Sequence, residues 1–364
     1  MGSGKGRVVV AMSGGVDSST AAYLLLREGY EVLGVSLDLY DFSNYIEGRA
    51  GTCCSLDDIY DARAVADHLG IPHYVFNYRD IFDGEVIENF IGEYSSGRTP
   101  NPCIICNDVI KFQVLLSRVK AIGSDYIATG HFAMITSGGD GEYSLHKGID
   151  GKKDQSYFLY RLNQETLPYL LFPCGGYTKG EVRAIADEAG LPVKDKGESQ
   201  EICFITENSY RDFLKKRGIQ DKSGEIVSVD GRILGEHRGI HGYTVGQRKG
   251  IGVSVGEPVY VVYIDPGKNR VVVGPEEYLF SKGALASSLT FVCSFDTGVS
   301  FRANAKVRYR AKEVPADVYM EKEGIKVLFD EQVKSVTPGQ SLVLYDGNRV
   351  LGGGIIERAI GAYD

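Results

Sequence analysis

The sequence predicts an α/β domain with a doubly wound parallel sheet, followed by a β-rich central domain and a C-terminal β-barrel. Strand-like and helix-like stretches alternate from residue 7 to about residue 135, as in a parallel sheet. After about residue 208, short β-rich runs are separated by glycine turns, and the end of the chain has no convincing helix. At 364 residues the chain is too long for one ordinary core, so we expect domains at 1–207, 208–280 and 281–364.

The first elements follow from their residue patterns. Arg7–Met12 is a short apolar, β-branched run, which is typical of a buried strand. Ser18–Glu28 is rich in helix-forming residues and stops at Gly29. Glu31–Leu37 predicts a second strand, and Asp57–Leu69 carries its apolar residues on one helical face.

The same alternation continues along the predicted α/β domain. Tyr74–Phe76 predicts a third strand, and a helix is expected near Phe82–Tyr94. A helix over Asp108–Ala121 leads into a strand that ends just before Gly130, and Tyr177–Ala189 predicts one more helix. Ligands of such sheets bind beyond the carboxyl ends of the strands. The turn after the first strand and Gly130 should therefore share that rim.

The bulk composition is that of an ordinary soluble globular protein, with 24% charged and 43% hydrophobic residues. No apolar run reaches the roughly 18 residues of a membrane span, and the N-terminus lacks the apolar segment of a signal peptide. We therefore expect a cytoplasmic protein. The net charge of −8 argues weakly against a nucleic-acid partner, unless basic residues gather on one face.

The run Ser13–Ser19 is the most informative stretch of the chain. It lies between a predicted strand and a predicted helix, so its glycine turn would present backbone N–H groups and a helix N-terminus to an anion. A kinase-type phosphate loop needs a lysine at the helix start, and this run has none. The run predicts a phosphate site of another type. Asp17 is its nearest carboxylate for Mg²⁺, and Ser13 and Ser18 offer hydroxyl groups.

The seven cysteines indicate metal-binding or catalytic thiols, because a reducing compartment does not favour a disulfide framework. Cys103 and Cys106 form a Cys-x-x-Cys ahead of the helix expected at Asp108, whose N-terminus would lower the pKa of the Cys106 thiol. Cys203, taken alone, is more typical of a buried and inert cysteine. Structural zinc needs four ligands, and the sequence offers no second Cys-x-x-Cys or matching histidine pair.

Several blocks of the sequence, taken in order, resemble those of the tRNA-specific 2-thiouridylases, a family within the ATP-pyrophosphatase superfamily. The resemblance covers essentially the whole chain. The blocks are the loop Ser13–Ser19, Gly97–Pro102, Cys106–Phe112, Ala128–His131, Lys153–Leu159, Ile202–Ile205, Tyr243–Gly250 and Pro338–Gln340.

This resemblance implies the family's reaction. ATP adenylates the C2 oxygen of the wobble uridine in a tRNA anticodon, and sulfur then replaces that oxygen, with release of AMP and pyrophosphate. Asp17 would hold Mg²⁺. The implied ATP-binding residues are Ala11, Met12, Ser13, Gly14, Gly15, Val16, Asp17, Ser18, Leu37 and Gly130.

The resemblance also implies roles for two distant cysteines. Cys203 would carry the incoming persulfide sulfur, and Cys106 would be the nucleophile that releases it by forming a Cys106–Cys203 disulfide. Asn101, Pro102 and Cys103 would line the target base, which must leave its stack to be reached.

The sequence departs from the family at Cys103, where many members carry an aspartate. Three thiols, from Cys103, Cys106 and Cys203, would suffice to hold a [4Fe–4S] cluster with one iron open to a sulfide. A cluster-dependent variant therefore stands as a hypothesis beside the persulfide route. Cys53 and Cys54 receive no role.

Contact with RNA is expected in spite of the acidic chain. Lys306, Arg308, Arg310 and Lys312 alternate with uncharged residues, and in a β-strand this period places all four cations on one face. The alternative is the solvated outside of a barrel. The resemblance implies tRNA contacts by His131, Lys153, Asp154, Gln155, Arg308, Tyr309 and Gln340.

We expect tRNA as the substrate and a sulfur-relay protein or desulfurase as the donor of persulfide or sulfide. No membrane partner is expected, and the protein should be a monomer or a weak dimer.

Two other functions stay open on the residues alone. A different ATP-pyrophosphatase, such as an NAD, GMP or argininosuccinate synthetase, would need neither paired cysteines nor an RNA-binding barrel. A non-catalytic thiol or iron–sulfur sensor that binds RNA would not need an intact pyrophosphate loop. ATP-dependent release of AMP in the presence of tRNA would exclude the sensor.

Overall fold

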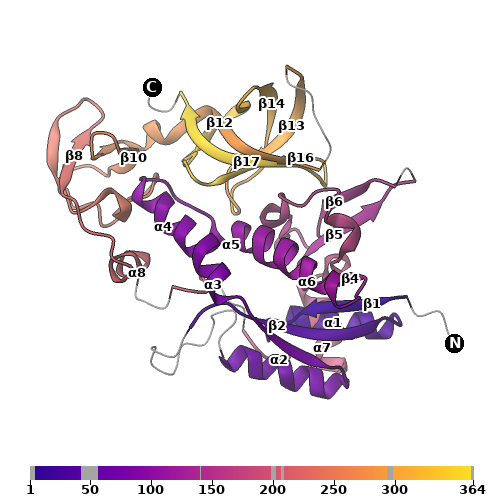
Figure 1. Ribbon diagram of the computed structural model, residues 1–364. Helices are drawn as coiled ribbons and strands as arrows, with labels where there is room; N and C mark the ends of the chain where they lie inside the picture. The colour runs from indigo at the N-terminus through magenta and orange to yellow at the C-terminus, as the bar shows by residue number, and fades with distance from the viewer. Residues whose placement is uncertain are drawn as a thin grey trace. The chain divides into compact units, whose positions relative to one another are not determined.

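The computed structural model describes residues 5–41, 56–139, 141–197, 202–205, 209–292 and 298–361 (Figure 1). These residues belong to two compact units, each described here by itself. The first unit lies within residues 1–86, 103–206 and 348–350, and the second within 87–102, 207–347 and 351–364.

Among the described residues of the first unit, five strands form a sheet in the order β3-β2-β1-β4-β7. Every neighbouring pair is parallel. The bounds are Arg7–Ala11 for β1, Glu31–Asp38 for β2, His73–Asn77 for β3, Tyr126–Ala128 for β4 and Leu170–Leu171 for β7. Because β2 and β4 lie on opposite sides of β1, the strand order reverses at β1, where parallel sheets bind their ligands.

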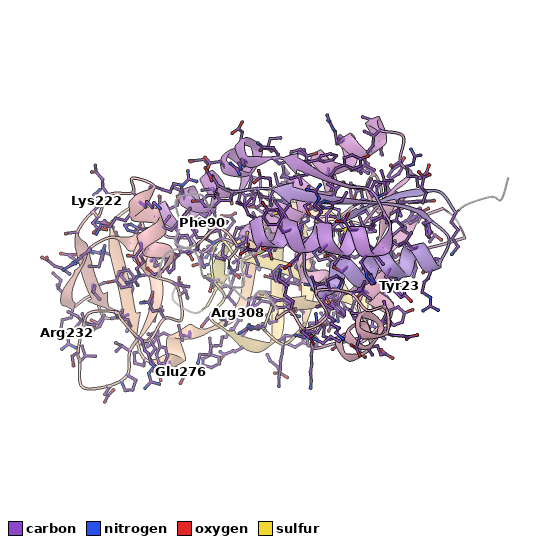
Figure 2. All side chains as sticks on the ribbon, turned by 90° about the horizontal axis from the view of Figure 1, so that it is seen from below. Tyr23, Phe90, Lys222, Arg232, Glu276 and Arg308 are labelled. Carbon is purple, nitrogen blue, oxygen red and sulfur yellow. The ribbon has the colours of Figure 1, made fainter. Side chains whose placement is uncertain are left out.

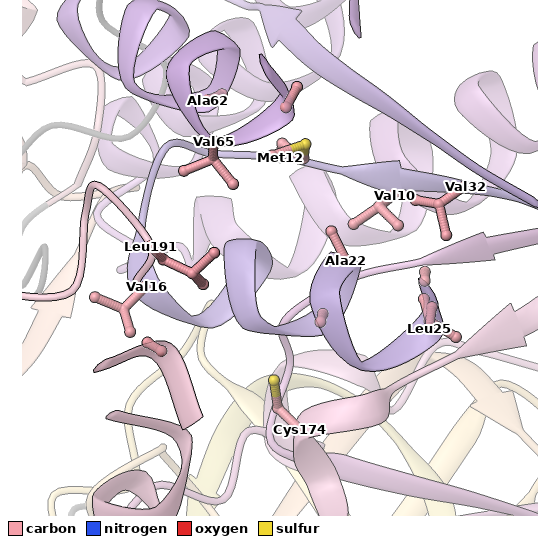
Figure 3. Close-up of a cluster of buried hydrophobic side chains, with 14 of the residues drawn as sticks. Val10, Met12, Val16, Ala22, Leu25, Val32, Ala62, Val65, Cys174 and Leu191 are labelled. Atoms are coloured by element: carbon pink, nitrogen blue, oxygen red, sulfur yellow. The ribbon is translucent and has the colours of Figure 1, made fainter. Parts of the chain in front are cut away.

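Helices cover this sheet. A core cluster joins β1 to α1 (Val16–Arg27), α2 (Leu56–Leu69) and α7 (Lys179–Glu188), and Figure 3 shows its side chains. Val9 of β1 points away from that cluster and is also fully buried, so the opposite face is covered too. The alternation in the sequence therefore correctly predicted a doubly wound parallel sheet.

The remaining elements of the first unit connect these layers. The antiparallel hairpin β5–β6 follows β4. The bounds are Arg79–Phe82 (α3), Asp83–Ile87 (η1), Ala133–Ser137 (β5), Tyr143–Lys147 (β6), Ser156–Leu159 (η3), Leu167–Tyr169 (η4) and Pro173–Gly176 (η5).

The helix expected at Asp108 begins earlier. It starts with α5 (Pro102–Ile105), continues as the π-helical segment η2 (Cys106–Val114) and ends as α6 (Leu115–Ala121). In the wider segment, the Leu115 N–H donates to the Ile110 carbonyl five residues back. The predicted start at Asp108 was wrong, because proline is well suited to the first position of a helix.

The second unit contains a small sheet and two short helices. Its strands run in the order β10-β11-β8-β9, and a core that includes Ile226, Val261 and Val271 fills one side. The rings of Phe90 and Phe213 lie 6.1 Å apart and join α4 to α8. The bounds are Glu88–Ser95 (α4), Tyr210–Lys216 (α8), Gly224–Ser228 (β8), Ile233–His237 (β9), Ile240–Gly242 (η6), Tyr260–Asp265 (β10), Arg270–Gly274 (β11) and Glu276–Leu279 (η7).

The described C-terminal strands close into a barrel, as the sequence predicts. The order is β12-β15-β14-β13-β16-β17, and β12 also pairs with β17. Val318, Val327 and Ile356 are fully buried in its core. The bounds are Phe280–Phe291 (β12), Ser300–Lys306 (β13), Val314–Glu321 (β14), Gly324–Lys334 (β15), Ser341–Asp346 (β16) and Arg349–Ile360 (β17). Across the described residues, no helix is long and apolar enough to cross a membrane.

Candidate active site and RNA-binding residues

The predicted phosphate loop leaves the carboxyl end of β1 and enters α1. Gly14 has a φ of 67°, and an added Cβ there would lie 2.2 Å from the Asp58 carbonyl oxygen. Only glycine fits this left-handed, crowded position. Gly15 is the N-cap of α1 and brings no side chain to cap it. The first turn of α1 thus has no side-chain cap, and a helix N-terminus of this kind suits an anion.

Serine hydroxyls stabilise the loop internally. The Ser13 N–H donates to Ser18 Oγ at 3.2 Å, and Ser18 Oγ donates to the Gly15 carbonyl at 3.2 Å. On β2, Ser36 Oγ donates to the Met12 carbonyl at 2.8 Å. Ser18 is buried, so its hydroxyl shapes the loop, whereas Ser13 is exposed.

The other two predicted nucleotide contacts lie beside the loop. Leu37 is near the end of β2 and Gly130 follows β4, and these strands flank β1. An added Cβ at Gly130 would lie 2.5 Å from the backbone carbon of Asp17. Gly130 thus lets two loops approach each other directly. The fold brings together the three segments from which the sequence predicts ATP binding.

Sequence reasoning missed a lysine at this loop. The Asp17 carboxylate forms an ion pair with Lys179, with 2.6 Å between Oδ1 and Nζ. Lys179 is the first residue of α7, whose start is fixed by a capping box between Thr178 and Glu181. The pattern Thr-Lys-Gly-Glu signals the helix start, but nothing in the sequence relates it to a loop so far away in the chain.

Cys174 lies beneath the same loop. Its sulfur donates to the Asp17 carbonyl at 3.3 Å, and the side chain is fully buried. Burial raises the pKa of the Cys174 thiol well above its usual range. The thiol therefore stays protonated and serves packing and loop support.

The two predicted catalytic cysteines lie in the same compact unit. Cys106 begins η2, and its side chain is half-buried. Cys203 is also half-buried, and the next residue, Phe204, anchors the segment because its ring packs 5.7 Å from that of Phe82. Cys103 is exposed.

The early helix start changes the electrostatic argument for these thiols. Cys106 lies beyond the first turn of the helix that begins at Pro102, while Cys103 lies within that turn. The N-terminal dipole acts mainly within the first turn, so it favours a thiolate at Cys103 more than at Cys106. The helix-terminus argument for Cys106 was therefore wrong.

The described residues contain no site for a single metal ion. Within the described part of the chain, no three His, Cys, Asp or Glu side chains are grouped so that they could hold a metal ion. Cys103, Cys106 and Cys203 are all described, so they do not form such a single-ion site, and the [4Fe–4S] cluster stays a hypothesis. Cys53 and Cys54 lie outside the described residues.

The segment before the target-base residues is held by the barrel within the second unit. Gln340 Nε2 donates to the Thr99 carbonyl at 2.9 Å and to the Pro100 carbonyl at 3.3 Å. The Thr99 N–H donates to the Pro338 carbonyl at 2.9 Å. We call this set of three hydrogen bonds the 99–340 clamp. The 99–340 clamp joins the sequence blocks Gly97–Pro102 and Pro338–Gln340, and Pro100 of the clamp precedes Asn101.

Several predicted RNA contacts in the first unit have structural partners. The buried Asp154 carboxylate accepts hydrogen bonds from the N–H groups of Gly148 and Ser156, each at 3.1 Å, and from the Ser156 hydroxyl. Gln155 Oε1 accepts from the Phe132 N–H at 2.9 Å. These two side chains shape the segment. Lys153 is half-buried beside them.

His131 is held neutral. Its Nδ1 lies 2.6 Å from Thr129 Oγ1, and its ring packs near those of Phe112 and Phe172. Burial, helped by the positive charge of Lys111, lowers the pKa of His131 well below its usual range. An RNA contact by His131 would use hydrogen bonding or stacking and not a positive charge.

The predicted stripe of four cations does not exist as one strand face. β13 ends at Lys306, and its pairing with β16 ends there too, so Arg308–Lys312 lie in the connection to β14. Arg308, labelled in Figure 2, instead lines a cavity of about 580 Å³ together with Arg211, Gln247 and Lys334. It donates to the Lys334 carbonyl at 2.7 Å. Tyr309 follows Arg308, and the centre of its ring lies 5.7 Å from Nζ of Lys306.

The fold and the loop define the class of the protein as a nucleotide-binding α/β protein with two β-rich additions. Family models match in the same order: the tRNA methyl transferase HUP domain over residues 6–207, the tRNA methyl transferase PRC-barrel domain over 211–275 and the aminomethyltransferase β-barrel domain over 281–356.

Curated relatives make the assignment narrower. The tRNA-specific 2-thiouridylase MnmA of Geotalea uraniireducens is 50% identical over 359 residues, which are 97% of this chain and 96% of the relative. The protein of the same name from Carboxydothermus hydrogenoformans is 49% identical over 361 residues, which are 98% of this chain and 99% of the relative. This chain belongs to the tRNA-specific 2-thiouridylase family, as its sequence blocks predicted.

Proposed function

We propose that this protein thiolates the wobble uridine of tRNA at C2, in a reaction driven by ATP. The observation that carries the proposal is the structure of the first unit. It joins a phosphate loop of non-kinase type, with Leu37 and Gly130 beside it, to the segments that bear Cys106 and Cys203. Relatives at about half identity over nearly the full chain carry the name of this activity.

The first step would be adenylation. The C2 oxygen of the uridine attacks the α-phosphate of ATP, the bond to the β-phosphate breaks, and pyrophosphate leaves. The amides of the first turn of α1 would bind the departing phosphates. The Asp17 carboxylate, one-third exposed at that turn, suits Mg²⁺, which binds through one or two carboxylates plus phosphate oxygens. Such an ion would neutralise charge on the leaving group.

The second step would transfer sulfur. The terminal sulfur of a persulfide on Cys203 attacks C2, and AMP leaves with the original oxygen. The Cys106 thiolate then attacks Sγ of Cys203. This breaks the bond between Sγ and the sulfur now attached to C2, and 2-thiouridine is left. The Cys106–Cys203 disulfide is finally reduced by a thiol reductant. A sulfur-relay protein or desulfurase would recharge Cys203.

The persulfide route has a [4Fe–4S] route as its alternative, with Cys103, Cys106 and Cys203 as the three thiolates. Iron and acid-labile sulfide assays on anaerobically purified protein distinguish the two. Full activity in an iron-free preparation supports the persulfide route, and activity proportional to bound iron would contradict it.

We further propose that the second unit binds tRNA through Arg308 and Tyr309 and that Asn101, Pro102 and Cys103 receive the target base. The other predicted RNA contacts are His131, Lys153, Asp154, Gln155 and Gln340. The side chains of Asp154, Gln155 and Gln340 bond to the protein's own backbone, so they would act by shaping the segments that meet the RNA. The basic side chains around the cavity at Arg308 support this proposal. The three family matches support domains at 1–207, 208–280 and 281–364.

The test is release of AMP in the presence and absence of tRNA, with wild-type protein and with Cys106→Ser and Cys203→Ser. We expect AMP release to need tRNA, and we expect both variants to lose thiolation while the release of pyrophosphate, which reports adenylation, continues. Release with a small-molecule acceptor and not with tRNA would favour another ATP-pyrophosphatase. A methylated tRNA would favour the tRNA methyl transferase activity after which the matching domain families are named.

A further inference from the structure

We propose that Lys179 is the cation that the phosphate loop itself lacks, and that it binds the β- and γ-phosphates of ATP and then the departing pyrophosphate. The proposal deepens the proposed function and rests on its adenylation step. It assigns the role of a phosphate-loop lysine to a residue that the chain supplies from another helix.

The position of Lys179 carries the argument. Its Nζ lies 2.6 Å from Oδ1 of Asp17, which is in the first turn of α1. That turn is where the amides of the loop would bind phosphate. A kinase-type loop places its lysine at the start of the helix, and here the ammonium group reaches the same end of the helix from outside.

The Lys179 side chain is held in place before any ligand binds. The capping box of α7 fixes the backbone of its first turn, and the Lys179 N–H donates to Asp150 Oδ2 at 3.0 Å. The Nζ atom also lies 5.7 Å from the centre of the Phe132 ring, and the side chain is only 12% exposed. Surface ion pairs are weak partly because two long side chains must be ordered, but this lysine is already ordered.

The charges explain why the ion pair matters for phosphate. The Asp17 carboxylate alone would repel a phosphate at the first turn of α1. Lys179 neutralises that carboxylate, so phosphate meets no net negative charge even without a metal, and a cation held by Asp17 would leave more of the ammonium charge to the phosphate oxygens. Lys196 is already paired with both Asp58 and Asp61, at 2.6 and 2.5 Å.

The rival interpretation is an ion pair that only joins α1 to α7. Two substitutions separate the possibilities, because each breaks the pair but only one removes the cation. Lys179→Met removes the cation, and Asp17→Asn removes the carboxylate and leaves the lysine. Lys194→Met is the matched control. It breaks the ion pair with Asp187 at 2.5 Å, which is exposed and contains no residue of the loop.

The experiment measures binding of inorganic pyrophosphate without metal, binding of ATP with Mg²⁺, and thermal unfolding for each variant. We expect Lys179→Met to weaken metal-free pyrophosphate binding by roughly tenfold or more, because charge-assisted hydrogen bonds are lost. Asp17→Asn should bind metal-free pyrophosphate at least as tightly as the wild type. Lys179→Arg should restore most of the affinity, and Lys194→Met should match the wild type.

The outcomes are distinct. If Lys179→Met binds pyrophosphate like the wild type, the inference is wrong while the proposed function stands. If both variants that break the pair lose affinity and stability together, the pair is only structural. If the wild type binds neither ATP nor pyrophosphate, both proposals fail. Should Lys179→Met not fold, weaker pyrophosphate binding by Asp17→Asn than by the wild type would still overturn the inference.

Discussion

Replacing Gln340 by glutamate tests whether the barrel positions the target-base segment. The substitution keeps the shape of the side chain but removes the amide donor that serves the carbonyls of Thr99 and Pro100 at 2.9 and 3.3 Å. Each lost hydrogen bond contributes about 0.5–1.5 kcal/mol, so the 99–340 clamp should lose about 1–3 kcal/mol. Opening of that segment should then become roughly 5- to 150-fold more frequent.

Hydrogen–deuterium exchange measures this opening directly, because the Thr99 N–H belongs to the clamp as a donor to the Pro338 carbonyl. Exchange in a peptide that covers residues 98–106 should accelerate in Gln340→Glu and stay unchanged in Gln332→Glu, an exposed glutamine of the same barrel. Thiolation should slow with little change in tRNA affinity. Unchanged exchange together with weaker tRNA binding would refute the clamp and favour a direct RNA contact by Gln340.

Three further predictions follow from single sites. Gly130→Ala should abolish ATP binding measured by titration, because its Cβ would lie 2.5 Å from backbone carbon of Asp17; wild-type affinity would contradict the close approach. The pKa of His131 is lowered in the folded state, so below about pH 6.5 the unfolded chain binds a proton there that the folded protein does not. The free energy of unfolding should therefore fall by up to about 1.4 kcal/mol per pH unit. Unfolding midpoints between pH 7 and pH 5 should thus fall less steeply in His131→Gln, and parallel profiles would oppose this account. Arg308→Ala should weaken tRNA binding and reduce the slope of log binding constant against log salt concentration by about 1, the value for one phosphate contact. An unchanged slope would exclude that contact.

The parallel sheet was predictable because its signals are local. The β-branched run before Ser13 and the glycine turn after it specify a strand and a helix whatever the rest of the chain does. The predicted limits of the first strand differ from β1 by one residue, Met12. Gly130 could be placed on the same rim as the turn after the first strand because parallel strands align their carboxyl ends.

Two element boundaries were predicted wrongly: the start of the helix at Pro102 and the end of β13 at Lys306. Pro102 follows Asn101, a residue type that favours helix caps, so the early start of the helix was encoded locally. The alternation from Lys306 to Lys312 resembles a strand. Pairing decides where a strand ends, and β13 pairs with β16 only as far as Lys306.

Contacts between distant segments could not be read from the sequence. Lys179 and Asp17 are 162 residues apart, and Gln340 and Thr99 are 241 apart. Both pairs come together only through tertiary packing, and each lies next to a motif that local reasoning had already singled out. The motifs therefore identified where chemistry is expected, while the structure identified the residues that support them.

The most direct test of the central claim is mass analysis of tRNA nucleosides after incubation with the protein, ATP, Mg²⁺, a persulfide donor and unmodified tRNA. We predict a 2-thiouridine nucleoside at the wobble position, formed in equal amount with AMP and absent with Cys203→Ser. AMP release without a thiolated nucleoside, or thiolation without ATP, would contradict the account.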